Sequence, residues 1–385
     1  MRDVIDRLSA NLVDRPAELK KLKDKGEKVI GFFPGDYVPD ELIFAAGAVP
    51  ICLVHGGNPS VVDASTSVTS RFLCPFARAQ MGEEVLKEQP FYSLIDMLIS
   101  PITCQHLRRA GDVWEYYSGI EVFRLGVPYK YDSERGLAYY LNMLRLLRSR
   151  LEQVTGNTIT DEKLRDAIAV YNRMRGLLKD IGETRKAAKP PISTLDFIKL
   201  NHASFYLDPT LMNNILANVV KTLKSSEARD ANGDRPRLLL TGPSVAYGDY
   251  KILELVEDCG GDIVVEELLE GVRYYRENVA IEEDPLRALA IKYLRNRVPP
   301  AFMRLATRKR FDFITKLASE FRVNGIIWYQ LLYCDTYDIE SYFFEKNLEG
   351  TGLPMLKLES DYTIQDRGPL KTRIEALLES IRMRS

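Results

Sequence analysis

Three of the five cysteines stand at places where a parallel α/β fold binds ligands. Cys104 directly follows the apolar run "MLISPIT", and Cys334 directly follows "IIWYQLLY". Cys74 precedes Pro75, which suits the first turn of a helix. Ligands of open parallel sheets bind beyond the carboxyl ends of the strands, and a helix N-terminus favours a thiolate. These three thiols are therefore candidates for one shared metal site.

Thiols at two strand ends and one helix start would suit an iron–sulfur cluster in a cleft between two sheets. Three thiolates can hold a [4Fe–4S] cluster and leave one iron open for another ligand. The alternative for any single cysteine is a small buried hydrophobic residue. The intervals of 30 residues from Cys74 to Cys104 and of 230 residues from Cys104 to Cys334 form no specific motif. The pattern alone therefore leaves both interpretations open.

The surroundings of the two other cysteines indicate structural roles for them. Cys52 lies inside the apolar strand "PICLV", and Cys259 precedes a glycine pair that ends a predicted helix. An odd number of cysteines without any CxxC pair argues against a disulfide framework, a zinc ribbon and a thioredoxin-type site. We therefore expect only Cys74, Cys104 and Cys334 to bind metal.

The elements around these cysteines alternate between strand and helix, which predicts parallel sheets covered on both faces. We expect an N-terminal helix and a first α/β domain over 1–132, a mainly helical connecting segment over 133–232, and a second α/β domain with a C-terminal helix over 233–385. The polar stretch "SSEARDANGDRP" is typical of an exposed loop before the second domain. Strands are predicted in "KVIGFFP", "VPICLVHGG", "SLIDMLISPITC", "GIEVFRLGVP", "RPRLLLTGP", "DIVVEEL", "NGIIWYQLLYC" and "LPMLKLESD".

Composition narrows the class of protein. The 385 residues include 53 Lys and Arg against 54 Asp and Glu, a net charge of −1. This balance gives no basic field for nucleic acid or a membrane surface. No apolar stretch approaches the roughly 18 residues of a membrane helix, and the charged N-terminus does not look like a signal peptide. We expect a globular, cytoplasmic protein that binds neither nucleic acid nor membranes.

Three further residues are candidates for acid–base chemistry. Asp36 lies in the turn after the first predicted strand, where a ligand at the top of the sheet would sit. Glu41 belongs to "PDEL", and its alternative role is a first-turn acid that complements the helix dipole. His55 ends the second predicted strand before two glycines, and could be a base or could cap a loop.

Other motifs carry weaker signals. His106 follows Cys104 by two residues and could orient a cluster ligand, whereas His202 is expected on a helix surface. "TGPSVAYGDY" lies between a strand and a helix but lacks the glycine pattern of a nucleotide site, so we expect it to line a ligand channel instead. The basic run "RLATRKR" could meet phosphate groups of a ligand, but a solvated helix face is the favoured interpretation.

Five segments, in chain order, are "FFPGDYVPDELIFAAGAVP", "RFLCPFARAQMG", "SPITCQHL", "YCDTYD" and "LPMLKLESDYTIQDRGPLKTRIEALLE". They resemble the 2-hydroxyacyl-CoA dehydratase family, which also includes the subunits of ATP-dependent benzoyl-CoA reductases and the double-cubane cluster proteins. The resemblance covers nearly the whole chain. Its most specific parts are the three cysteine contexts and the C-terminal segment.

The resemblance implies two flavodoxin-like parallel-sheet domains with a [4Fe–4S] cluster in the cleft between them. Family members hold the cluster through three cysteines, which here match Cys74, Cys104 and Cys334. The turn after the first strand carries a polar residue near the cluster in the family, and Asp36 is its nearest match. Double-cubane members need more than these three cysteines. The two remaining cysteines lie outside the matching contexts, so a single [4Fe–4S] cluster fits better.

The resemblance also implies radical chemistry on an acyl-CoA substrate. A separate ATP-dependent iron–sulfur activator protein delivers one low-potential electron, the thioester becomes a ketyl radical anion, and the 2-hydroxyl group leaves. The first prediction is thus an iron–sulfur subunit of an anaerobic 2-hydroxyacyl-CoA dehydratase that works as a dimer of related subunits. One alternative is a subunit of a benzoyl-CoA reductase-type enzyme that reduces an aromatic acyl-CoA. Another is a non-catalytic or electron-carrying partner subunit.

Overall fold

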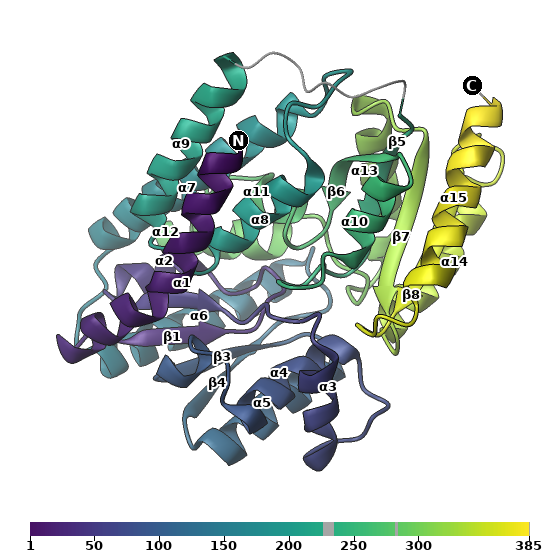
Figure 1. The fold of residues 1–385 in the computed structure, drawn as a ribbon. Coiled ribbons are helices and arrows are strands. Elements are labelled where there is room, and N and C mark those ends of the chain that lie inside the picture. The colour runs from purple at the N-terminus through teal and green to yellow at the C-terminus, as the bar shows by residue number, and fades with distance from the viewer. Residues whose placement is uncertain (226–234, 282–283, 385) are drawn as a thin grey trace.

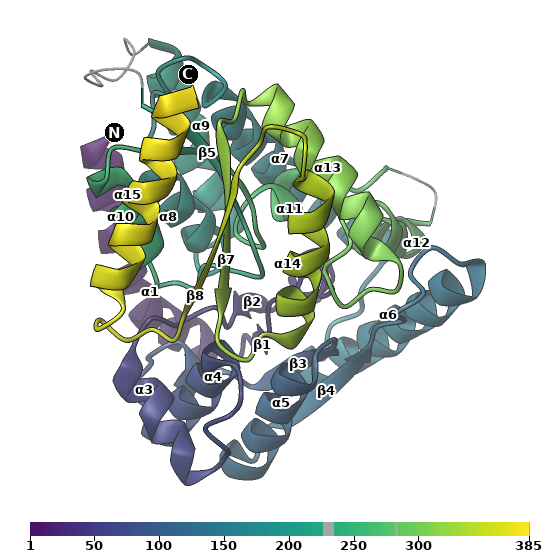
Figure 2. The same cartoon turned by 90° about the vertical axis from the view of Figure 1, so that its right-hand side faces the viewer.

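Two four-stranded parallel sheets form the framework of the chain in the computed structural model, which describes residues 1–225, 235–281 and 284–384 (Figures 1 and 2). The first sheet has the order β2–β1–β3–β4 and the second has the order β6–β5–β7–β8. The strands of the first sheet are β1 (Val29–Phe32), β2 (Val49–Cys52), β3 (Met97–Ile102) and β4 (Glu121–Gly126). Those of the second are β5 (Arg237–Thr241), β6 (Asp262–Glu267), β7 (Gly325–Leu331) and β8 (Met355–Ser360).

Both sheets therefore repeat one topology: within each sheet the strands lie in the order second, first, third, fourth. All neighbouring strands are parallel, and this order is that of the flavodoxin-like fold. Strands β1 and β7 are buried along their full length, as expected for central strands with helices on both faces. The predicted fold class and all eight predicted strands are confirmed.

The first sheet and the helices α1 to α5 around it form the first unit of the chain. Helix α5 packs on β3 and β4, and α2 packs on β2. Figure 2 shows α3, α4 and α5 together at the bottom of the molecule, on one side of this sheet. The helices are α1 (Arg2–Asp24), α2 (Asp40–Ala45), α3 (Pro59–Ala64), α4 (Pro75–Leu86) and α5 (Gln105–Ser118).

A helical segment follows, as predicted. Its helices are α6 (Glu134–Thr155), α7 (Asp161–Thr184), α8 (Thr194–Ser204) and α9 (Pro209–Ser225). The side chains of Ser133, Thr160 and Ser193 cap the first three of these helices by accepting a backbone N–H. Most of the predicted loop "SSEARDANGDRP" and the boundary predicted at 232 lie outside the described residues, so the domain limits stay predictions.

The second unit has both long and very short helices. They are α10 (Lys251–Asp258), α11 (Val272–Tyr275), α12 (Pro285–Ala290), α13 (Ala306–Glu320), α14 (Asp335–Leu348) and α15 (Arg367–Arg384). A π-helical turn over Ile291–Arg295 continues α12. The basic run at the start of α13 is only partly solvated, because Arg310 is fully buried and lies 3.2 Å from Glu267.

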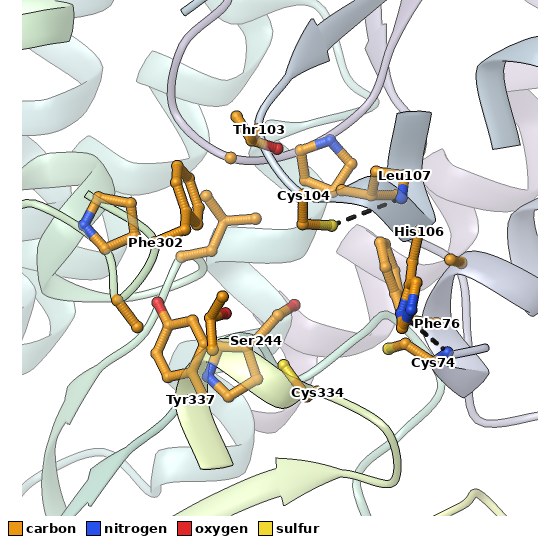
Figure 3. Close-up of a pocket in the computed structure, with 18 of the residues that line it drawn as sticks. Cys74, Phe76, Thr103, Cys104, His106, Leu107, Ser244, Phe302, Cys334 and Tyr337 are labelled. Atoms are coloured by element: carbon orange, nitrogen blue, oxygen red, sulfur yellow. Dashed lines mark hydrogen bonds between the residues drawn. The ribbon is translucent and has the colours of Figure 1, made fainter. Parts of the chain in front are cut away.

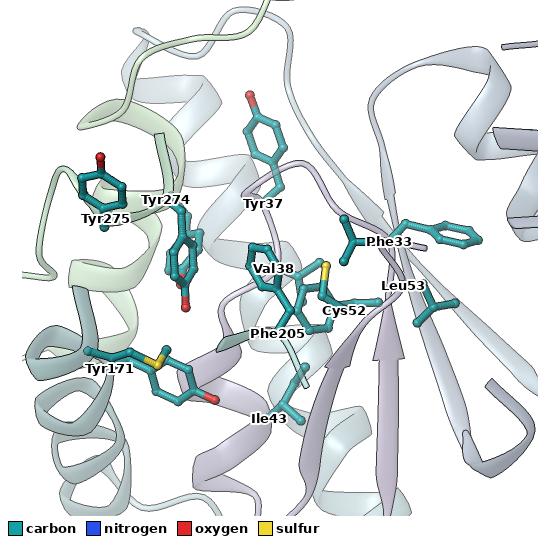
Figure 4. Packing of buried hydrophobic residues seen from close by; sticks show 14 of the residues in the cluster. Phe33, Tyr37, Val38, Ile43, Cys52, Leu53, Tyr171, Phe205, Tyr274 and Tyr275 are labelled. Atoms are coloured by element: carbon teal, nitrogen blue, oxygen red, sulfur yellow. The ribbon is translucent and has the colours of Figure 1, made fainter. Parts of the chain in front are cut away.

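A continuous hydrophobic core joins the first unit, the helical segment and part of the second unit. Figure 4 shows its aromatic centre, where Cys52 lies among Val38, Phe205 and Tyr274. Cys52 is 1% exposed, which agrees with the structural role expected for it. Because the core runs through both units, the strand ends that face each other are held in a fixed arrangement.

The contact between the two units, called the seam below, depends on close backbone approach at two glycines. His55 and Tyr247 form an isolated parallel bridge, and the N–H of Gly56 donates to the carbonyl of Tyr247 at 2.9 Å. At Gly57, whose φ is +75°, an added Cβ would lie 2.5 Å from the backbone of Gly248. The glycine pair is thus needed for close approach of two chain segments.

Candidate functional site

The three candidate cysteines line one pocket of about 520 Å³ between the two units (Figure 3). Cys74 is the N-cap residue of α4, Cys104 that of α5 and Cys334 that of α14. Cys104 follows β3 by two residues, and Cys334 follows β7 by three. The strand-end positions predicted for Cys104 and Cys334 and the helix start predicted for Cys74 are confirmed. In addition, all three residues share the N-cap position.

Local hydrogen bonds fix these caps. The Sγ atom of Cys104 accepts the N–H of Leu107 at 3.4 Å. The N–H of Cys74 donates to Nδ1 of His106 at 3.1 Å, so the start of α4 is tied to the first turn of α5 (Figure 3). Cys334 follows Tyr333, which has a left-handed φ of +62° and turns the chain from β7 into α14. The three thiols are therefore presented by backbone that is already ordered.

Burial dominates the protonation of these thiols. It raises the pKa of Cys74 to about 12, although N–H groups of the first turn of α4 act in the opposite direction. The pKa values of Cys104 and Cys334 are also raised by burial, and the neighbouring cysteines raise that of Cys334 further. The N–H groups at the helix starts favour the thiolates as expected, but desolvation of the free thiols outweighs them. A bound metal would displace these protons.

The donor set suits a thiolate-bound cluster. Within the described part of the chain, no three His, Cys, Asp or Glu side chains are arranged to hold one metal ion. A cubane cluster is larger than an ion, so its thiolate ligands stand farther apart around it. Three cysteines facing one pocket from two domains match the thiolate chemistry of a [4Fe–4S] cluster with an open iron.

Among the predicted acid–base candidates, Asp36 is the one that lines this pocket. Its φ of +56° is left-handed, and its carboxylate lies 3.4 Å from Nη2 of Arg297. Arg297 also donates from Nη1 to the carbonyl of Gly35 at 2.9 Å and stacks 4.1 Å from the ring centroid of Tyr37. The turn after β1 is thus held to the second unit by one arginine.

Glu41 and His55 are not among the residues that line the pocket. Glu41 is fully buried, pairs with Arg175 at 2.7 Å and accepts the hydroxyl of Tyr293 at 2.7 Å. His55 bonds through Nδ1 to the hydroxyl of Tyr206 at 2.7 Å, and burial lowers its pKa to about 3. Both fit structural roles, and their catalytic roles stay predictions.

The remaining histidine belongs to the core. His202 is fully buried, so the expectation of a helix-surface residue is wrong. Its Nε2 lies 2.9 Å from the carbonyl of Val245, and its Nδ1 lies 3.1 Å from the hydroxyl of Tyr250. His202 therefore connects the helical segment to the loop after β5.

Several pocket residues carry no recognisable sequence motif. Arg273 donates from Nε to Glu267 at 2.5 Å and from Nη1 to the hydroxyl of Tyr337 at 2.7 Å. Ser244, in the stretch expected to line a channel, does line the pocket and lies on the same side as Tyr337 and Cys334 (Figure 3). Phe302 adds an apolar wall. Only the "TGPSVAYGDY" context offered a sequence signal for any of these residues.

Comparison with known proteins agrees with this geometry. The family described as "2-hydroxyglutaryl-CoA dehydratase, D-component" matches residues 36–381. The chain belongs to this family. The matched range contains all three pocket cysteines, and the resemblance seen in the sequence is confirmed.

Relatives of the dehydratase D-component family align over nearly their full length. The YjiM protein of Escherichia coli (strain K12) is 28% identical over 366 residues, 94% of this chain and 93% of that protein. The (R)-phenyllactyl-CoA dehydratase beta subunit of Clostridium sporogenes is 24% identical over 377 residues, 96% and 97% of the two chains. A benzoyl-CoA reductase subunit of Thauera aromatica is 25% identical over 388 residues, 99% and 98%. Membership places the chain among enzyme components of the dehydratase type.

None of the helices in the described ranges combines the length and the apolar character needed to cross a lipid bilayer.

Proposed function

We propose that this chain is the [4Fe–4S] subunit of a 2-hydroxyacyl-CoA dehydratase-type enzyme. The observation that carries the proposal is the meeting of Cys74, Cys104 and Cys334 in one pocket, each from the N-terminus of a different helix. These three residues would hold the cluster. When bound, it would supply the low-potential electron that converts an acyl-CoA thioester into a ketyl radical anion, from which the 2-hydroxyl group leaves.

The protein's own residues bind and shield the substrate in this proposal. The pocket combines apolar walls such as Phe302 with the guanidinium groups of Arg273 and Arg297. Apolar walls exclude water from a reactive radical, and buried cations stabilise negative charge on the thioester oxygen. Asp36 holds Arg297 in place through their ion pair.

A related partner chain and an activator complete the proposed system. The relatives are named as beta subunits of dehydratases and as one of the subunits of benzoyl-CoA reductase, which supports a partner subunit for this chain. We propose a cytoplasmic dimer of related subunits that receives its electron from an ATP-dependent iron–sulfur activator protein. The similarity to a benzoyl-CoA reductase keeps reduction of an aromatic acyl-CoA as a second candidate, and an electron-carrying subunit as a third.

Metal analysis of anaerobically purified protein tests the ligand assignment. We expect about four irons and four sulfides per chain, with an EPR signal on reduction. Cys334→Ala should lose most of this iron, whereas Cys259→Ala should keep it, because Cys259 lies at the end of α10 and does not line the pocket. Wild-type protein without iron, or a Cys334→Ala variant with a full cluster, would contradict the proposal.

Assays with the activator and ATP then separate the candidate functions. Loss of water from (R)-phenyllactyl-CoA or 2-hydroxyglutaryl-CoA supports a dehydratase, and reduction of benzoyl-CoA supports the second candidate. A chain that holds a cluster but acts on no thioester, even with its partner present, would favour an electron-carrying role.

A further inference from the structure

Among the fully buried glutamates, one differs from the rest. The fully buried glutamates are Glu41, Glu266, Glu267 and Glu270. The first three each form an ion pair with a buried arginine, at 2.7 Å, 2.7 Å and 2.5 Å respectively. For Glu270, no ion pair is found within the described residues. A buried carboxylate without a cation is costly, so this group has a strong tendency to hold a proton.

Among the residues that the structure describes, no cation lies within ion-pair distance of Glu270. Its Oε2 accepts the N–H of Val245 at 3.1 Å, and its Oε1 accepts the hydroxyl of Ser244. The titratable groups that face it come from four different segments, and all are neutral or anionic: Asp36, Cys52, Tyr250 and Tyr362. Burial, with a smaller contribution from Asp36, raises the pKa of Glu270 to about 7 against the opposing effect of hydrogen bonds from Ser244 and from backbone N–H groups.

Ser244 connects this carboxyl group to the pocket. Ser244 lines the same pocket as the three cysteines, whereas Glu270 lies behind it. The loop that presents Ser244 is fixed, because Nη2 of Arg273 donates to the carbonyl of Gly242 at 2.7 Å. A hydroxyl group in a pocket, bonded to a buried carboxyl group, can pass a proton between a ligand and the protein interior.

Other ionisable residues of the pocket are less suited to this task, and Asp335, which also lines it, is exposed to solvent. Asp36 is paired with Arg297, and Arg273 is paired with Glu267. The ring of His106 accepts the N–H of Cys74 through Nδ1. Among the pocket residues that the structure describes, Ser244 is therefore the one whose side chain bonds to a buried carboxyl group without an ion pair.

We propose that Ser244 and Glu270 form the proton-accepting pair of this pocket, with Ser244 in contact with the acyl group of the substrate. The inference rests on the proposed function. A C–H bond at carbon 3 of the activated thioester breaks, and its proton moves to Oγ of Ser244 while the hydroxyl proton of Ser244 moves to Glu270. The electron pair of that bond stays on the substrate, and Glu270 becomes neutral.

An infrared titration of the purified protein tests the pair without any substrate. Between pH 5 and pH 9, wild-type protein should show a protonated-carboxyl band that disappears with a midpoint near pH 7 and is absent from Glu270→Gln. Ser244→Ala should shift this midpoint upward, because a hydrogen bond to the carboxylate is lost, and Ser244→Thr should restore it. A Glu270 band that does not titrate in this range, or that ignores Ser244→Ala, would overturn the proposal.

Glu83→Gln is the matched control. Glu83 is also a buried carboxyl group whose pKa is raised to about 7 by burial, but it lies on α4 away from the pocket lining. Its substitution should remove a separate band and leave the Ser244-dependent band in place.

Kinetics then test the role of the pair on the thioester identified by the functional assay. In the wild type, kcat should rise with pH through an ionisation near 7. In Glu270→Gln this rise with pH should disappear, and kcat should fall by about 100-fold or more, while the iron content stays at the wild-type level. A rise of kcat with pH that persists in Glu270→Gln and disappears in Asp36→Asn would assign the base to Asp36 and overturn the proposal. An inactive wild type would count against the proposed function alone, since the infrared titration is independent of turnover.

Discussion

At the scale of single residues, the N-cap position explains how the proposed cluster site can be both buried and able to bind metal. An N-cap side chain points back over the first turn of its helix, where backbone N–H groups lack partners. At Cys104 such an N–H already reaches Sγ. Burial keeps the thiols protonated in the absence of metal. The same N–H groups would then stabilise the sulfur charge once a cluster replaces the protons.

In the proposed cluster site, His106 should control how firmly the metal is held. Its Nδ1 accepts the N–H of Cys74 and so fixes the distance between two helix starts that carry ligands. His106→Phe removes the acceptor, and we expect iron loss to a chelator to become about tenfold faster or more, as for other residues that orient metal ligands. His106→Asn places Oδ1 close to the position of Nδ1 and should restore slow release.

The comparison of these two variants separates positioning from general stability. The thermal unfolding midpoints of the metal-free His106→Phe and His106→Asn proteins should be similar, because the side chain is partly exposed. Equal iron release from wild type and His106→Phe would show that the hydrogen bond has no role in retaining metal.

The residue types of the site were only partly predictable. Cysteines stand out because they are rare, and their place after apolar runs indicated strand ends. Arg297 and Glu270 gave no such signal, because arginine and glutamate are common and are normally solvated. Their importance comes from being buried opposite groups that lie far away in the chain, such as Asp36 and Ser244. Single-sequence patterns do not contain that pairing.

At the scale of elements, alternation of strands and helices predicted both sheets because each central strand is a continuous apolar run. The long helices α6 and α7 were equally clear, since each has apolar residues at helical spacing and a serine or threonine cap. The short helices α11 and α12 and the π-helical turn were not predicted. Segments of four to six residues carry too few turns for periodicity, and tertiary packing determines their conformation.

Gly242 should be essential for the loop that carries Ser244. A Cβ atom at this position would lie 1.8 Å from the carbonyl oxygen of Tyr329 in β7, which is backbone and cannot turn away. We expect Gly242→Ala to lower the free energy of unfolding by about 1–3 kcal/mol and to displace Ser244 from the pocket wall. Denaturant unfolding and the infrared band of Glu270 measure the two effects.

Gly176 provides the control for this substitution. It lies inside α7, and a Cβ atom there would meet nothing within 4 Å. Gly176→Ala should therefore stabilise the protein by about 0.5–1 kcal/mol, because alanine loses less backbone entropy in a helix. If both variants changed stability by the same amount, the close approach at Gly242 would not be the cause.

At the scale of the whole molecule, two similar sheets face each other because the helical segment and a shared core hold them. The core that contains β1 also contains Trp328 of β7, so apolar packing is continuous between the two units. The seam is built from close backbone contact at Gly57 and from two buried histidines, His55 and His202. Each histidine bonds to groups of another segment of the chain.

This seam should make the molecule sensitive to acid. Burial lowers the pKa of His202 to about 3, whereas an unfolded histidine has a pKa near 6.5. Below pH 6.5 the unfolded state therefore binds a proton that the folded state does not, and stability falls as the pH decreases. The loss from this one residue amounts to about 2 kcal/mol between pH 7 and pH 5.

His202→Gln tests this prediction, because the amide can still donate to the carbonyl of Val245 but does not titrate. Denaturant unfolding at pH 7 and at pH 5 should show a smaller loss of stability in the variant than in the wild type, by about 2 kcal/mol. His55 remains in both proteins, and burial, the larger cause of its lowered pKa, is present in both. Equal losses in the two proteins would mean that His202 already carries a proton in the folded state, or that the seam opens at pH 5 before the rest of the molecule unfolds.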